Sequence, residues 1–140
     1  MNIYTLYKTF QTILTGVSSD VEFKPAWFKY VDNKTPDTWA SFKINLRDSR
    51  GLTDGEQTTN ATFLLDVRSN RADGQKFVAD IIEEVLNALS VTGHLTSFDC
   101  KYTHHVVGVT AQSIGNLITE NGVVRQACRI QFFVDSYSKQ

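Results

Sequence analysis

The stretch from Ala61 to Leu89 constrains the fold most, because the period of its apolar residues changes within it. From Ala61 to Arg68 apolar and polar residues alternate, which is typical of a strand with one buried face. After a polar break at Ser69 and Asn70, apolar residues recur at the spacing of an amphipathic helix. These helical positions are Phe77, Val78, Ile81, Ile82, Val85, Leu86 and Leu89. The pattern predicts a strand that leads directly into a helix packed on its sheet.

A second helix is predicted at the N-terminus, from about Asn2 to Thr15, with Gly16 ending it. The helix after the break is expected to start near Asn70 to Asp73, with Asn70 as its N-cap and Asp73 at the third helical position, and to end between Ser90 and His94. Three strands are predicted between the two helices. They are the aromatic stretch 21–31, the alternating residues 42–46 and the strand 61–68.

Further strands are predicted after the second helix, around residues 98–102, 106–112 and 128–134, where 106–112 either continues the strand at 98–102 or pairs with it. The last pattern is the strongest, and the segment from Gly115 to Gly122 is expected to be a polar turn. The element order is therefore α-β-β-β-α-β-β-β. We expect an α+β fold, in which two helices pack on one face of a mixed, mainly antiparallel sheet.

The polar segment from Asp48 to Asn60 is predicted to be a loop or the tip of a long hairpin. Loops of this length are usually functional or disordered. This one carries charges of both signs, at Asp48, Arg50, Asp54 and Glu56, and Arg47 precedes it. It is interpreted either as a solvated tip or as an arm that reaches a neighbouring copy of the chain.

The length and charge of the chain limit the classes of protein it can belong to. Its 140 residues are the size of one domain, predicted to span residues 1–140. The net charge of −1 counts against a free nucleic-acid binder, which normally has a basic surplus, and is compatible with self-association. No apolar run is long enough to span a membrane, and no signal peptide is recognised, so no membrane partner is expected.

No group of residues predicts an enzyme or a cofactor site. His104 and His105 are neighbours on an expected strand and point to opposite faces, so with His94 and Cys100 they make a weak metal candidate. The carboxylates have no recognisable apolar surroundings that would separate their pKa values, and Asp66 is expected to pair with Lys43 or Arg68. Nucleophile-elbow, Walker and dinucleotide-binding motifs are absent.

The two cysteines, Cys100 and Cys128, lie in alternating apolar patterns. They are interpreted as buried, reduced thiols that behave as small apolar side chains, although a disulfide between neighbouring strands is possible. Neither interpretation predicts a catalytic or metal-binding role for the cysteines.

An aromatic cluster between Phe23 and Phe42 is the most conspicuous local bias in composition. Aromatic residues grouped in this way more often pack in a core or an interface than stack on bases, and Trp27 is the candidate for an interface. Nearby lysines also leave base stacking on a nucleic acid open. Phe133 and Leu64 lie on otherwise polar strand faces, so a bare sheet face opposite the helices is expected to meet a partner there.

The whole chain resembles the tail terminator (tail completion) proteins of long-tailed bacteriophages. The strand–break–helix unit LLDVRSNRADGQKFVADIIEEVLNAL carries the resemblance, together with the closing strand RIQFFVDSYS. The order of the elements and the length also match. These are patterns of hydrophobicity rather than a catalytic signature.

The resemblance implies a structural virion protein that forms a ring, usually of six copies, in the tail or neck. Such a ring ends polymerisation of the tail tube protein and offers a docking surface to the head–tail connector protein. DNA passes through the lumen without specific binding, and assembly takes place in the host cytoplasm. A ring needs one patch on each copy to meet a different patch on the next, and the bare sheet face and the hairpin tip are the expected candidates.

Two other interpretations remain open. The chain is either a different virion part, such as another neck component or a tube subunit, or a small domain that binds single-stranded nucleic acid through its aromatic cluster. An enzyme is the weakest alternative.

Overall fold

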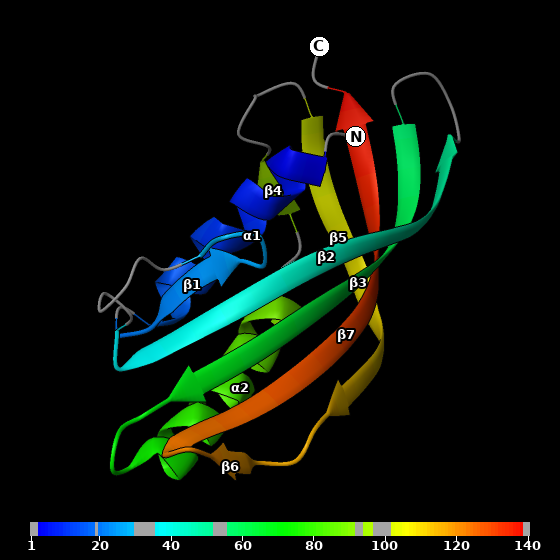
Figure 1. Ribbon diagram of the computed structural model, residues 1–140. Coiled ribbons are helices and arrows are strands. Elements are labelled where there is room, and N and C mark those ends of the chain that lie inside the picture. Colours follow the sequence, from blue (N-terminus) through cyan, green and yellow to red (C-terminus); the bar gives the residue numbers. More distant parts are fainter. Residues whose placement is uncertain are drawn as a thin grey trace.

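The computed structural model describes residues 3–18, 20–29, 36–51, 56–91, 94–96 and 102–138. These residues form two helices and seven strands (Figure 1). In chain order they are α1 (Ile3–Val17), β1 (Glu22–Pro25), β2 (Thr38–Gly51), β3 (Glu56–Ser69), α2 (Gly74–Val91), β4 (His94–Thr96), β5 (Tyr102–Ile114), β6 (Ile118–Glu120) and β7 (Val123–Ser138).

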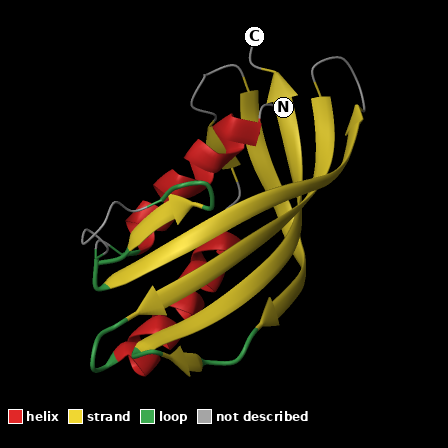
Figure 2. Cartoon of the chain, in the orientation of Figure 1, coloured by secondary structure: helices red, strands yellow, loops and turns green. Residues whose placement is uncertain are grey.

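The strands form one sheet in the order β1-β2-β3-β7-β5-β4, and β6 pairs with β7 beyond the end of β5. The β1–β2 pair is parallel and every other pair is antiparallel. Both helices cover the same face of the sheet (Figure 2). The predicted α+β fold is therefore confirmed, including its mixed, mainly antiparallel sheet.

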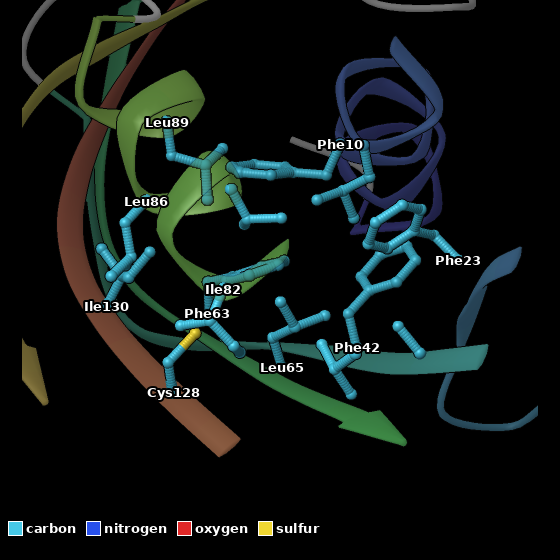
Figure 3. Packing of buried hydrophobic residues seen from close by; sticks show 14 of the residues in the cluster. Phe10, Phe23, Phe42, Phe63, Leu65, Ile82, Leu86, Leu89, Cys128 and Ile130 are labelled. Atoms are coloured by element: carbon cyan, nitrogen blue, oxygen red, sulfur yellow. The ribbon is translucent and has the colours of Figure 1, made fainter. Parts of the chain in front are cut away.

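The hydrophobic core lies between this face and the two helices. Phe10 of α1 packs its ring 5.5 Å from that of Phe63 and 5.4 Å from that of Phe132, so one helix side chain joins β3 to β7. The α2 residues Ile82, Leu86 and Leu89 cover the part of the core beside α1, on the same face of the sheet (Figure 3). The alternation predicted for the strands is confirmed, because their inward residues are buried: Ala61, Phe63, Leu65 and Val67 of β3, and Cys128, Ile130, Phe132 and Val134 of β7.

The polar break between β3 and α2 is a turn of four residues, longer than predicted. The Asn70 N–H donates to the Asp37 carbonyl (3.0 Å), and the Arg71 N–H donates to the Ser69 hydroxyl (3.2 Å). β3 ends at Ser69 and α2 begins only at Gly74, so four residues separate Ser69 from the helix. The expected N-cap at Asn70 is wrong, and Asp73 directly precedes the helix instead. The ends of α1 differ less, because the helix continues through Gly16 to Val17.

Of the two alternatives for the segment from Asp48 to Asn60, a loop or the tip of a long hairpin, the structure favours the hairpin, and the predicted antiparallel pairing of its two strands is confirmed. Asp48 opposes Asn60 and Gly51 opposes Gln57, while residues 52–55 lie outside the described part. The alternation stops at Leu46 because a β-bulge follows it, with Arg47 as the extra residue. Before the bulge, even-numbered residues of β2 oppose the inward residues of β3; after it, odd-numbered residues do. Because the inward positions change from even to odd numbers, the alternating pattern of residues 42–46 does not continue into the rest of the strand.

The remaining differences concern short or irregular strands. β1 covers four residues of the predicted stretch 21–31. Tyr102 and residues 106–112 belong to one strand, β5, which contains two irregularities that follow Val106 and Val109. β4 and β6 were not predicted, and β6 lies inside the expected turn from Gly115 to Gly122. Of the strand predicted at 98–102, residues 98–101 lie outside the described part of the chain.

The free edge of β2 beyond β1 is closed by a side chain. β1 pairs with β2 only as far as Phe42. Two residues further on, the Ile44 N–H donates to the Tyr7 hydroxyl (2.8 Å), and that hydroxyl also lies 3.4 Å from the Ile44 carbonyl. A tyrosine from α1 thereby takes the place of a neighbouring strand at this position.

Candidate interaction surfaces

No helix covers the second face of the sheet in the described part of the chain, and we call this the outer face. Its residues alternate with the buried ones along the three central strands, β2, β3 and β7. They are Ser41, Lys43 and Asn45; Thr58, Asn60, Thr62, Leu64, Asp66 and Arg68; and Arg125, Ala127, Arg129, Gln131, Phe133 and Asp135. The sequence predicted such a bare face, with Leu64 and Phe133 on it.

An ionic cluster occupies one end of the outer face. Asp66 Oδ2 lies 3.0 Å from an Arg68 guanidinium nitrogen and 3.3 Å from one of Arg125. The predicted pairing of Asp66 with Arg68 is confirmed, and Arg125 of the neighbouring strand is its second partner. Because these side chains are partly exposed, the pairs contribute little to the stability of the lone chain.

Two polar atoms of the outer face are buried without a hydrogen-bond partner in the described chain. They are Asp66 Oδ1 and Thr62 Oγ1. Beside them, a shallow hollow of about 180 Å³ lies over Leu64 and Ala127, between Lys43 and Asp66. Buried polar atoms are nearly always satisfied in proteins, so such atoms beside an apolar hollow suit a surface that meets something else.

The predicted contact residues fall in two separate places. Phe133 is 37% exposed and shares a row of the sheet with Asn60 and Asp48, so it lies near the hairpin of β2 and β3. The side chains of Arg47, Asp48, Arg50 and Glu56, and the whole of Asp54, lie outside the described part. Trp27 lies close to the row of Phe42, about 20 Å along the strand from that of Asp48.

Trp27 belongs to an exposed group that we call the aromatic–lysine surface: Tyr4, Lys8, Lys24, Trp27 and Phe28. These residues line one hollow of about 200 Å³ between α1 and the end of β1. The Trp27 ring lies 4.5 Å from that of Tyr7, and the Lys8 and Lys24 ammonium groups lie 5.3 and 5.0 Å from the centres of the Tyr4 and Phe28 rings. The aromatic cluster predicted from the sequence is therefore divided, because Phe23 and Phe42 are core residues.

A second exposed group was missed by the sequence analysis. Leu117 and Ile118 are about half exposed where β6 begins, and we call them the aliphatic edge; Ile114, also about half exposed, opposes the inward residue Cys128 at the end of β5. The signal was present, because two of these large aliphatic residues lie in the segment predicted to be a polar turn.

The structure adds no chemical site to these surfaces. Among the described residues, no three His, Cys, Asp or Glu side chains are grouped so that they could hold a metal ion. The side chains of the three histidines and all of Cys100 lie outside the described part. Cys128 is a free, buried thiol, and burial raises its pKa from the ordinary 9.0 to about 12, so it is neutral near pH 7. Of the two described helices, neither is long and apolar enough to cross a membrane.

Comparison with known proteins identifies the fold but no family. No protein-family model matches the chain. No curated protein matches it either. Among solved structures, a chain in the virion of a native gene transfer agent particle is similar, with a TM-score of 0.52 and 13% identity over 96% of this chain and 92% of that one. A protein that carries only a catalogue number as its name is also similar, with a TM-score of 0.59 and 15% identity over 100% of this chain and 99% of that one.

Proposed function

We propose that this chain is a structural protein of a phage-like virion, and specifically a tail terminator. The observation that carries the proposal is the outer face, where unsatisfied buried polar atoms and an apolar hollow lie on a sheet that no element of the described chain covers. A similar fold in the virion of a gene transfer agent particle supports the same class of protein. In this proposal the chain has no enzymatic activity and no cofactor.

The proposed assembly is a ring of identical copies, usually six in the family that the sequence resembles. The ring caps the tube built by the tail tube protein, prevents further polymerisation and presents its other side to the head–tail connector protein. DNA passes through the lumen without being held, which agrees with the near-zero net charge. The protein is assembled in the host cytoplasm and remains in the tail or neck of the virion.

Electron microscopy of the purified chain tests the proposal, with light scattering to give the mass. We expect closed rings of one size that bind the ends of isolated tail tubes. Filaments without a defined length would identify a tube subunit, and rings that bind only head particles would identify another neck component. A strictly monomeric protein that binds no virion part would contradict the proposal.

A further inference from the structure

Exposed hydrophobic side chains are concentrated at two places, on opposite sides of the central strands. Seven large hydrophobic residues are exposed in the described part of the chain: Tyr4, Trp27, Phe28, Ile114, Leu117, Ile118 and Phe133. The first three belong to the aromatic–lysine surface, and Leu117 and Ile118 form the aliphatic edge. Single exposed apolar residues are normal, but grouped ones usually mark a contact.

The two surfaces lie on opposite sides of the central strands β2, β3 and β7. The aromatic–lysine surface is beside β1, the first strand of the sheet, where α1 packs on it. The aliphatic edge is on the far side of β7, where β5 ends and β6 replaces it as the neighbour of β7. A closed ring of identical copies needs two different patches on each copy, because one patch must meet a different patch on the next copy, and these two surfaces meet that requirement.

Charge distinguishes the two surfaces and makes them complementary. Lys8 and Lys24 stand beside the exposed rings of the first surface. On the second surface Glu120 is exposed two residues after Ile118. Arg125 opposes Ile118 in the ladder, but its guanidinium group already lies 3.3 Å from Asp66. The aliphatic edge therefore offers an acidic group to a cationic surface.

The composition of each surface also suits a protein contact. Tyr and Trp are enriched at the centres of interfaces, because a large ring loses little conformational entropy when it is buried. The ring of Trp27 is already held by Tyr7 on one side and is 56% exposed on the other. Aliphatic side chains such as Leu117 and Ile118 are the size that fills a hollow lined by aromatic rings.

We propose that the aromatic–lysine surface of one copy binds the aliphatic edge of the next copy, head to tail. The inference rests on the proposed self-association of the chain and names the surfaces that produce it. Trp27 and Phe28 contact Leu117 and Ile118 across the interface, and Glu120 lies near Lys8 and Lys24. The outer face then remains available for other virion components.

A pair of variants tests this contact in the full-length chain. Trp27→Glu blocks one surface and Leu117→Glu blocks the other, so we expect each variant alone to form no rings. Mixed in equal amounts they retain one intact contact, and they should form one-to-one dimers that grow no further, measured by light scattering. Thermal unfolding checks that each variant is folded, and Lys8→Glu with Lys24→Glu replaces Trp27→Glu if that variant is not.

Thr15→Glu is the matched control, since it places the same charge on an exposed position of α1 that belongs to neither surface. It should leave the rings intact. Glu120→Lys should weaken the mixed dimer by about tenfold, because it sets like charges against each other. If wild-type rings form and both blocking variants still assemble, this inference is wrong while the proposed function stands.

Two other results separate the inference from the proposed function. If the wild-type chain is monomeric at every concentration, the proposed function fails, and this inference fails with it. If that monomer binds oligothymidine with a steep salt dependence that Trp27→Glu abolishes, the aromatic–lysine surface is a nucleic-acid site instead.

Discussion

The two faces of the same central strands differ sharply in composition and packing. On the inward face of β3, Phe63 is fully buried and its ring lies 5.5 and 5.9 Å from those of Phe10 and Phe42. Its neighbour Leu64 points to the outer face, between Lys43 and Arg129 in the ladder, and is only half-buried. One residue of displacement along the chain therefore separates a dry aromatic core from a polar surface.

The difference indicates that the two faces serve separate purposes. The inward residues satisfy one another within the single chain, so they specify its fold. The outer residues include buried polar atoms that have no partner in the described chain, at Thr62 and Asp66. Their hydrogen bonding is incomplete in the single chain, as expected of a surface used in assembly.

The largest expected effect compares adjacent residues on opposite faces. Phe63→Ala should lower the free energy of unfolding by about 3–5 kcal/mol, because it removes a ring at the centre of the core. Leu64→Ala should lower it by about 1 kcal/mol or less. Denaturant unfolding of the two variants measures both values, and equal losses would mean that the outer face is as tightly packed as the inner one.

A smaller effect is expected for the contact of α1 with the edge of β2. Tyr7→Phe leaves the buried Ile44 N–H without its 2.8 Å partner, so the free energy of unfolding should fall by about 1–3 kcal/mol. Thr12→Ala, which removes an exposed hydroxyl bond on the same helix, should change it by less than about 0.5 kcal/mol. A negligible change in Tyr7→Phe would show that water replaces the hydroxyl.

Alkaline pH probes the dryness of the inward face at Cys128. The folded thiol ionises near pH 12, whereas the unfolded thiol ionises near its ordinary pKa of 9.0. Stability from this group is therefore complete below pH 9 and is lost as the pH rises towards 12. At pH 10 the loss should be about 1.4 kcal/mol.

Comparison with Cys128→Ala isolates this effect from other groups that titrate in the same range. The gap in unfolding free energy between wild type and variant should narrow by that amount from pH 8 to pH 10. A gap that is independent of pH would indicate that water reaches the thiol in the folded chain.

The smallest effect is expected on the outer face. Asp66→Asn weakens two partly exposed ion pairs and should lower the free energy of unfolding by less than about 1 kcal/mol, and less still at high salt. Asp80→Asn on α2 is the control, because it affects a more exposed pair with Lys76. A loss comparable with that of Phe63→Ala would remove the distinction between the two faces.

Alternation predicted the core because each inward residue of β3 and β7 keeps its parity along the strand. The same rule failed in β2, where the bulge at Arg47 exchanges odd and even positions. The polar residues that follow lie outside the alternating pattern, although the backbone pairs as far as Gly51. That part of the strand pairs with β3 through backbone hydrogen bonds, and a pattern of side-chain hydrophobicity does not predict backbone hydrogen bonds.

The candidate surfaces were predicted only in part. Trp27, within the aromatic cluster, and Phe133, on a polar strand face, were predicted as contact residues, and both are exposed. The aliphatic edge was not predicted, because Leu117 and Ile118 follow a glycine in a segment of turn-forming residues, and β6 is only three residues long. The aromatic–lysine surface combines α1 with β1, and only the folded chain brings Tyr4 near Trp27.

The hydroxyl of Tyr7 has a consequence for how this sheet behaves in crowded surroundings. An open strand edge is a template on which another molecule can add a strand of its own, and fibres grow by that route. At Ile44 both backbone groups already face a hydroxyl group that belongs to the helix. A strand from another molecule would have to displace this hydroxyl before it could pair with β2 at Ile44, which disfavours fibre growth from that position.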